Sequence, residues 1–141
     1  MSSQTNDHAA GQTTGERLAA ISNAAVQILA EHTGRGPTRA RTTISGAWVF
    51  ITLEDTLTKG ERQLAANGQE DWVLQTRRRF QDIMRPALEA VVEKQLERRV
   101  IAFMSDNHID PDIAVEVFIL EPIAADTAIQ AAIAVADPVS E

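Results

Sequence analysis

The longest regular pattern in this 141-residue sequence is an apolar stripe over residues 69–97. Its side chains recur every three or four residues, which is the spacing of one side of an α-helix. The stripe contains Trp72, Val73, Thr76, Phe80, Ile83, Met84, Ala87, Leu88, Val91, Val92 and Leu96. Pro86 interrupts the pattern without shifting its phase, so we expect one long kinked helix, with two shorter helices as the alternative.

Two further segments, residues 16–32 and residues 59–66, are predicted to be helices. The first repeats apolar side chains at helical spacing, and the second is short and ends at an Asn-Gly pair. Each follows a threonine that precedes a glutamate by three residues, which is the pattern of a capping box. These pairs are Thr13 with Glu16 and Thr58 with Glu61.

Two pairs of short apolar segments predict β-hairpins. Residues 38–45 are rich in β-branched side chains and are joined to residues 47–54 through a Ser-Gly turn. Residues 100–104 and 113–120 form the second pair, and a polar loop joins them. The last of these segments carries one charge, at Glu116.

The strand predicted over residues 47–54 has apolar side chains on both of its faces. Trp48 and Phe50 point to one side, while Val49 and Ile51 point to the other. This pattern indicates an inner strand, or one that a partner covers. We therefore expect a homodimer that buries sheet or helix surface.

The element order α-β-β-α-α-β-β predicts an α+β fold, with a four-stranded sheet of two antiparallel hairpins covered by helices. We expect one domain over residues 16–121. Residues 1–15 are predicted to be a flexible polar tail, and residues 122–141 a flexible, acidic, alanine-rich tail. A weak helix is expected within that second tail, over residues 124–135.

The acidic excess is unevenly distributed along the chain. The formal net charge is −7, from 13 basic and 20 acidic residues. Residues 16–121 contain all 13 basic and 16 of the acidic residues, so this segment carries only −3. A local site for an anion or an acidic partner is therefore compatible with the low isoelectric point.

Composition also excludes several classes of protein. Because the chain has no cysteine, it has no disulfide, no thiolate zinc site and no cysteine nucleophile. No apolar run approaches the roughly 18 to 20 residues that span a bilayer. The chain opens without a basic and apolar signal peptide, so we expect a cytoplasmic protein.

The first candidate site is the segment GRGPTRAR over residues 34–41. Gly36 allows close approach of backbone N–H groups, and Arg35, Arg39 and Arg41 could bind an anion or an acidic partner. The segment lacks the Lys-Ser/Thr of a P-loop. The structural alternative is a helix stop followed by a solvated strand face.

The second candidate site is the polar loop over residues 105–112, which could bind a divalent cation. Its candidate ligands are Asp106, His108, Asp110 and Asp112. The spacing does not match an EF-hand, and the same residue types are common in ordinary turns. A metal-dependent enzyme or small-ligand protein therefore remains an alternative, with the metal unknown.

The third candidate is the basic run Arg77, Arg78 and Arg79, which suggests a nucleic-acid-binding module. The acidic balance of the folded segment and the absence of interleaved aromatic residues make nucleic-acid binding unfavoured. No hydrolytic triad is indicated, because His32 and His108 lack a GxSxG motif. We therefore predict no catalytic residues and no cofactor, and favour a protein that is not an enzyme.

Four stretches together resemble the MpsC-like family of small soluble bacterial proteins, first catalogued as a domain of unknown function. They are ISNAAVQILAEHTGRGPTRARTTI (21–44), LEDTLTKGE (53–61), RRFQDIMRPALEAVVE (78–93) and VIAFMSDNHIDPDIAVEVFIL (100–120). The family is named for a sodium-linked, membrane-potential-generating system. The resemblance implies a non-enzymatic accessory or regulatory protein of sodium or inorganic-carbon uptake, with a membrane transporter subunit as partner.

The resemblance also turns the polar motifs into a candidate surface for a partner or for a small anion such as bicarbonate. Residues of the candidate surface are Arg35, Gly36, Arg39, Arg41, Thr58, Lys59, Glu61, Ser105 and Asp106. Lys59 lies at a predicted helix start, where an anion is favoured. We also expect Arg41 and Asp106 to pair across neighbouring strands.

Overall fold

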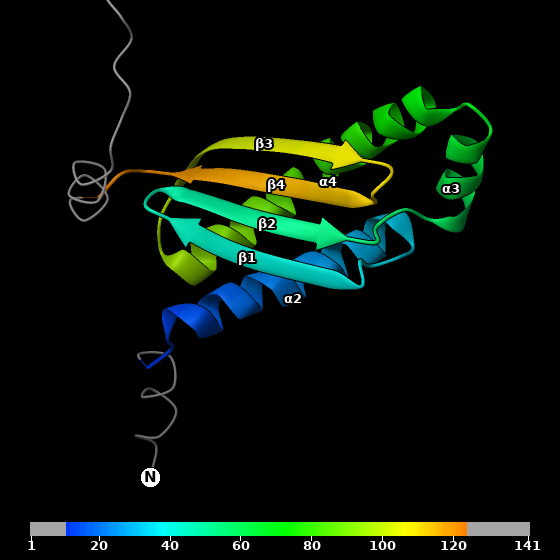
Figure 1. Ribbon diagram of the computed structural model, residues 1–141. Helices are drawn as coiled ribbons and strands as arrows, with labels where there is room; N and C mark the ends of the chain where they lie inside the picture. Colours follow the sequence, from blue (N-terminus) through cyan, green and yellow to red (C-terminus); the bar gives the residue numbers. More distant parts are fainter. Residues whose placement is uncertain (1–10, 124–141) are drawn as a thin grey trace, which may run out of the picture.

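The computed structural model describes residues 11–123, and its elements follow one another in the predicted order (Figure 1). The helices are α2 (Thr14–Thr33), α3 (Lys59–Ala66) and α4 (Glu70–Leu96). The strands are β1 (Arg39–Ser45), β2 (Trp48–Glu54), β3 (Val100–His108) and β4 (Ile113–Leu120). The predicted α+β class is confirmed, while the helix expected over residues 124–135 lies outside the described residues.

The four strands form one antiparallel sheet in the order β1-β2-β4-β3. The two hairpins therefore lie side by side, with β2 and β4 in the centre and β1 and β3 at the edges. Helices α2 and α4 pack against each other and against one face of this sheet, α2 beside β1 and α4 beside β3 (Figure 1).

The core lies between these two helices and the inner face of the sheet. Its main side chains are Ile21, Ala25 and Leu29 from α2, Met84, Leu88 and Val92 from α4, and Val49, Ile51, Leu53, Phe118 and Leu120 from the strands. Each large apolar side chain buried in this way contributes about 1.5 to 3 kcal/mol. The two layers are thus held together chiefly by burial of apolar surface.

The helix ends follow the capping signals in the sequence. The Thr13 hydroxyl accepts a hydrogen bond from the backbone N–H of Glu16 at 3.1 Å, and Gly34 ends α2 with a φ of 80°. At α3 both bonds of the capping box form, between Thr58 and Glu61. The local sequence therefore determines where these helices begin and end.

Helix α4 runs through Pro86 without a break, so the expectation of one long helix is confirmed. Its buried face differs from the predicted stripe, because Trp72 and Ile83 are 54% and 62% exposed. Arg77 and Gln81 are instead buried, at 4% and 5%. Polar partners from α3 and the sheet make these two positions favourable inside the protein.

Strand β3 is longer than the sequence predicts. The polar segment from Ser105 to His108 continues the pairing with β4 and does not belong to the loop, which shortens to residues 109–112. The residue types are those of a turn, but main-chain hydrogen bonds to β4 and contacts with α4 hold them in the sheet.

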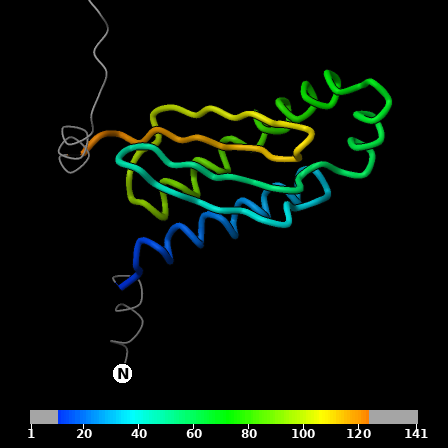
Figure 2. The backbone as a smooth tube through the Cα atoms, in the orientation of Figure 1, coloured from blue at the N-terminus to red at the C-terminus, as the bar shows by residue number. Residues whose placement is uncertain are grey.

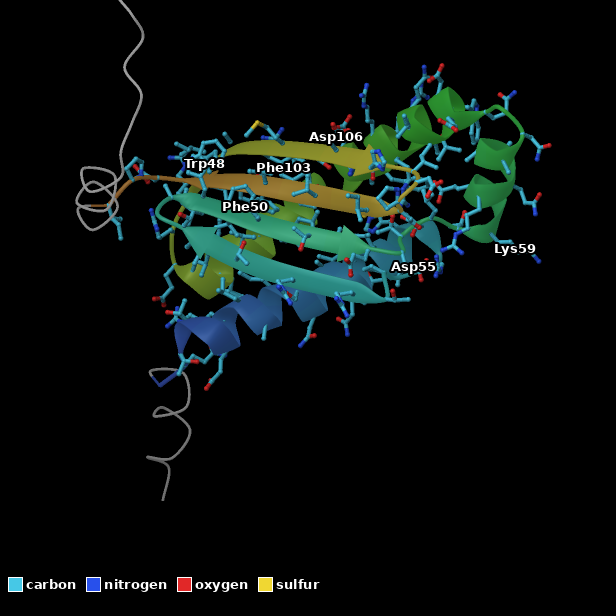
Figure 3. All side chains as sticks on the ribbon, in the orientation of Figure 1. Trp48, Phe50, Asp55, Lys59, Phe103 and Asp106 are labelled. Carbon is cyan, nitrogen blue, oxygen red and sulfur yellow. The ribbon has the colours of Figure 1, made fainter. Side chains whose placement is uncertain are left out.

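The second face of the sheet carries Arg41, Phe50, Met104 and Val117, and we call it the open face. No helix of residues 11–123 covers it (Figure 1). Trp48 is 40% exposed and Met104 is 48% exposed there. Figure 3 looks onto this face, with Trp48 and Phe50 toward one end of the strands.

Candidate functional site

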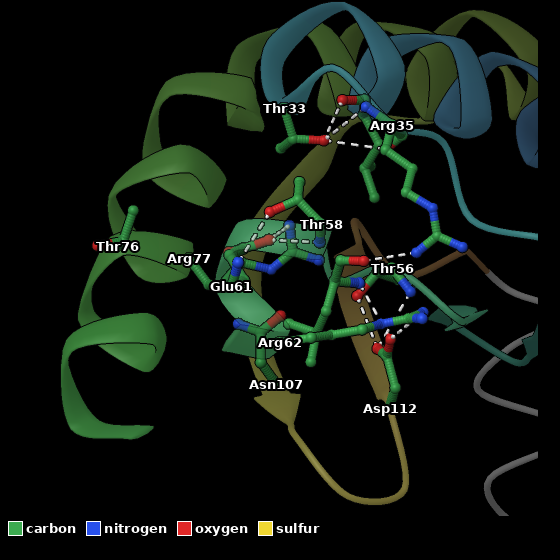
Figure 4. A network of polar contacts seen from close by, with 12 residues as sticks. Thr33, Arg35, Thr56, Thr58, Glu61, Arg62, Thr76, Arg77, Asn107 and Asp112 are labelled. Atoms are coloured by element: carbon green, nitrogen blue, oxygen red, sulfur yellow. Dashed lines mark hydrogen bonds and ion pairs between the residues drawn. The ribbon is translucent and has the colours of Figure 1, made fainter. Parts of the chain in front are cut away.

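Three connections of the chain meet at one end of the sheet (Figure 2). They are the loop after α2, the link from β2 to α3 and the turn between β3 and β4. Polar side chains from these connections and from α3 contact one another there (Figure 4). We call this group the polar loop cluster, which consists of Arg35, Asp55, Arg62 and Asp112.

Asp55 lies between two guanidinium groups. Arg35 Nη2 is 2.7 Å from Asp55 Oδ2, and Arg62 pairs with the other carboxylate oxygen. The hydrogen bond from Arg35 and the charges of both arginines lower the pKa of Asp55. Asp55 also has a φ of 59°, a left-handed conformation that aspartate tolerates better than most residues. Two cations thus converge on one carboxylate near the protein surface.

Asp112 holds the link before α3 against the β3–β4 turn. Its carboxylate accepts hydrogen bonds from Thr56 N at 3.0 Å, from Thr56 Oγ1 at 3.1 Å and from Leu57 N at 3.0 Å. Arg62 Nη2 lies 3.6 Å from the same carboxylate. Asp112 is therefore a structural anchor that positions both Asp55 and the start of α3.

The other side chains of the 105–112 segment do not converge with Asp112. Asp106 is exposed on the open face, Asp110 is exposed in the turn, and His108 Nδ1 contacts Pro111 O at 2.8 Å. Within residues 11–123 no group of three or more histidine or acidic side chains is placed to hold a metal ion. The geometry therefore gives no support to the metal hypothesis.

A second polar group is buried beneath α4, close to the polar loop cluster. Glu61 Oε1 accepts a hydrogen bond from Thr58 N at 2.8 Å and lies 3.6 Å from Arg77 Nη1. Both side chains are at most 10% exposed. This ion pair ties α3 to α4, and it leaves only Arg78 and Arg79 of the basic run on the surface.

Glu116 is buried in the same region, at 1% exposure. Its Oε1 accepts a hydrogen bond from Gln81 Nε2 at 3.2 Å, and Gln81 Oε1 accepts one from Asn107 Nδ2 at 2.9 Å. Burial raises the pKa of Glu116 to about 7, against the lowering influence of Ser105, Gln81 and Arg77. This carboxyl is therefore poised to change its charge near neutral pH.

The space beside Glu116 is small. A cavity of about 10 Å³ is lined by side chains of α4, β3 and β4, including Arg77, Gln81 and Asn107. That volume holds roughly one water molecule, so it does not admit a substrate. Glu116 therefore belongs to a polar network of the core that has no room for a ligand.

The structure brings some of the predicted surface residues together. Arg35, Thr58 and Glu61 lie in or beside the polar loop cluster, and Lys59 is exposed on the first turn of α3. Gly36 allows the chain to approach α2, because a Cβ there would meet Val26 Cγ1 at 3.1 Å.

The remaining predicted residues lie elsewhere. Arg39 pairs with Glu54 at 3.3 Å on the open face, and Ser105 points inward opposite Glu116. The expectation that Arg41 and Asp106 pair across neighbouring strands is wrong, because β1 and β3 are the two edges of the sheet. Hairpins adjacent in sequence can meet through either strand, and here β2 and β4 meet.

Several residues of these groups were not recognised from the sequence. Asp55 and Arg62 resemble ordinary surface charges, and only the fold brings them to Arg35. The sequence does indicate that Glu116 is unusual, since a lone acid in an apolar strand is often a buried functional or structural group. Nothing in the sequence indicates that Gln81 is buried, because a glutamine on a helix is usually exposed.

The fold and the polar groups define a small α+β protein with an internal polar network and a charged cluster at one end of its sheet. A family model described as "Na+-translocating membrane potential-generating system (MpsC)" matches residues 13–122. The chain therefore belongs to the MpsC family. Comparison with curated proteins and with solved structures found no match. None of the helices in residues 11–123 combines the length and apolar composition needed to cross a membrane.

Proposed function

We propose that this protein is a non-enzymatic accessory or regulatory component of a Na⁺-translocating, membrane-potential-generating system. It acts on the cytoplasmic side by binding a membrane-embedded subunit. The family description supplies the system. The observation that carries the proposal is the polar loop cluster, where distant parts of the chain present paired charges at one end of the molecule.

The cluster also supports the binding of a small anion such as bicarbonate. Bicarbonate is planar, singly charged and similar in shape to a carboxylate, so it suits the bidentate geometry of arginine. Asp55 already occupies the position between Arg35 and Arg62 that such an anion would take. We propose that Asp55 acts as an internal ligand, and that a competing anion changes the surface offered to the partner.

Retention on membranes tests the partner proposal. We expect the full-length protein to co-purify with a membrane subunit from native extracts, and Lys59→Glu and Arg62→Glu to weaken this retention at least tenfold. Arg79→Glu is the matched control, because it makes the same change on the exposed side of α4. Recovery of the wild-type protein only as a free species, at every salt and bicarbonate concentration, would contradict the proposal.

Calorimetry with bicarbonate tests the anion proposal separately. Asp55→Asn removes the internal competitor, so we expect it to bind bicarbonate at least tenfold more tightly than the wild type. Glu54→Gln is the control, because it frees Arg39 from a single exposed ion pair. Equal binding by the two variants would indicate general attraction to arginine, and no binding by Asp55→Asn would refute an anion site.

A further inference from the structure

The open face is divided along its strands into an apolar half and a polar half. The strand pairing places Trp48 beside Ile119, and Phe50 between Thr43 and Val117. These side chains, together with Met104, form the apolar half. Exposed apolar surface of this kind is common at sites where proteins associate.

One row of the polar half carries opposite charges at its two ends. Reading across the sheet, the row runs from Arg41 through Thr52 and Val115 to Asp106. Three strand spacings separate the two charged positions, which is about 14 Å. Neither side chain makes an ion pair within residues 11–123. The two charged ends of the row are therefore unpaired within residues 11–123.

We propose that the open face binds the same face of a second copy, around a two-fold axis that runs parallel to the strands. Such an axis places β1 of one subunit over β3 of the other at the same height along the strands. Arg41 then meets Asp106 of the partner subunit, and by symmetry the reverse pair forms as well. Two ion pairs that one chain cannot make are completed by the dimer.

The same axis matches the apolar half with itself. Trp48 lies over Ile119 of the partner subunit, and Phe50 lies over Val117 of the partner subunit. Sheets that pack in this aligned way are about 10 Å apart, a separation that large side chains fill. A two-fold axis across the strands would instead place Trp48 over Glu54 of the partner subunit. Charge and apolar patterns therefore favour the first arrangement.

The area of the face indicates which class of interface to expect. Four strands and the seven positions paired between β1, β2 and β4 cover roughly 20 by 24 Å. This footprint is at the small end of protein interfaces, where weak and transient complexes lie, so we expect a dimer that dissociates in the micromolar range.

The arrangement also sets the direction of the two polar loop clusters. A two-fold axis parallel to the strands leaves both clusters at the same end of the dimer. This consequence rests on the proposed function: the dimer then presents two equal contacts to a membrane-embedded partner. Two linked contacts bind more tightly than one when both can engage.

Charge exchange tests the dimer with the purified full-length protein. Arg41→Asp and Asp106→Arg should each weaken self-association at least tenfold in sedimentation velocity, because like charges then face each other. Mixed in equal amounts, the two variants should form a heterodimer within about threefold of wild-type affinity, since both cross-subunit pairs are then opposite in charge. Arg79→Asp is the control and should leave the wild-type dimer unchanged. Circular dichroism checks that each variant is folded.

The contrary outcomes are equally specific. A wild-type protein that stays monomeric at about 100 micromolar overturns the proposal. The open face would then have another occupant, either a different protein or residues 124–141 of the same chain. A dimer that is insensitive to both single exchanges places the interface elsewhere. Failure of the exchanged variants to form a heterodimer refutes the Arg41–Asp106 contact. None of these results depends on a membrane partner, so they are independent of the proposed function.

Discussion

The same four strands form both faces of the sheet, but helices bury the inner face and leave the open face exposed. On β2, Val49 and Ile51 point to the inner face and are at most 1% exposed, while Trp48 on the open face is 40% exposed. Strand alternation separates the two sets, and helix packing decides which set is buried. The difference teaches that apolar alternation alone does not identify the core face of a strand.

The two faces also differ in whether their charged side chains are buried and paired. The inner face contains Glu116, whose hydrogen bond to Gln81 joins a buried network. The open face contains Arg41 and Asp106, which are exposed and belong to no ion pair within the described chain. A buried charge needs partners in its own chain, whereas an exposed charge can take water or a second subunit.

The largest expected difference between the faces comes from two phenylalanines on adjacent strands. Phe118 is fully buried on the inner face, and Phe50 lies on the open face. Phe118→Ala should lower the free energy of unfolding by about 3 to 5 kcal/mol, because it removes buried surface and leaves a cavity. Phe50→Ala should cost about 1 kcal/mol or less in the monomer.

Chemical denaturation of both variants, at a concentration low enough to keep the chains monomeric, measures this difference. Equal losses of stability would mean that the open face is covered within the same chain. Phe50→Ala should still weaken self-association, which sedimentation velocity reports.

The next effect concerns pH. In the unfolded chain the Glu116 carboxyl has a pKa near 4.5, and in the folded protein burial raises that pKa to about 7. The folded state therefore favours the protonated carboxyl, so stability from this group is complete below pH 4.5 and is lost as pH rises through 7. Between pH 5 and pH 8 the wild type should lose about 2 to 3 kcal/mol relative to Glu116→Gln.

Urea denaturation of both proteins across this pH range measures the effect. Asp106→Asn makes the equivalent change on the open face and serves as the control. At a concentration that keeps the chains monomeric, its stability should be within about 0.5 kcal/mol of wild type at both pH values. Parallel pH profiles for the wild type and Glu116→Gln would show that the buried carboxyl does not titrate near neutrality.

The smallest expected difference comes from two neighbouring threonines on β1. Thr42 points inward, and its hydroxyl is 2.7 Å from Ser22 Oγ on α2. Thr43 points to the open face and is exposed. Thr42→Val should cost about 1 kcal/mol through the lost hydrogen bond, and Thr43→Val should be neutral within about 0.5 kcal/mol. Thermal unfolding of the pair checks this, and reversed effects would show that β1 has the opposite register.

Much of the fold could be predicted because its signals are local. The Thr13 cap of α2, the capping box of α3, the helical spacing of α4 and the turn at Gly46 each depend on a few neighbouring residues. The length of β3 was underestimated, because turn-forming residues from Ser105 onward are held in the sheet by a partner strand. Contacts between distant segments override local preference there.

The candidate site was harder to predict than the fold. Arg35 and Lys59 were recognised as surface charges, but the grouping of Arg35 with Asp55 and Arg62 depends on three loops meeting at one end of the sheet. The burial of Arg77 likewise depends on Glu61 arriving from another helix. Such groupings carry no fixed sequence spacing.

The sequence by itself determined the identity, order and most boundaries of the helices and strands, because hydrogen bonds and caps within one segment depend on neighbouring residues. It also determined that β2 would be apolar on both faces. Only the tertiary structure decided that β2 and β4 are neighbours, which carboxyl is buried, and that Arg41 and Asp106 lie at opposite edges. Those outcomes depend on how separate segments pack, and burial of the shared apolar core selects one packing among several that the local signals allow.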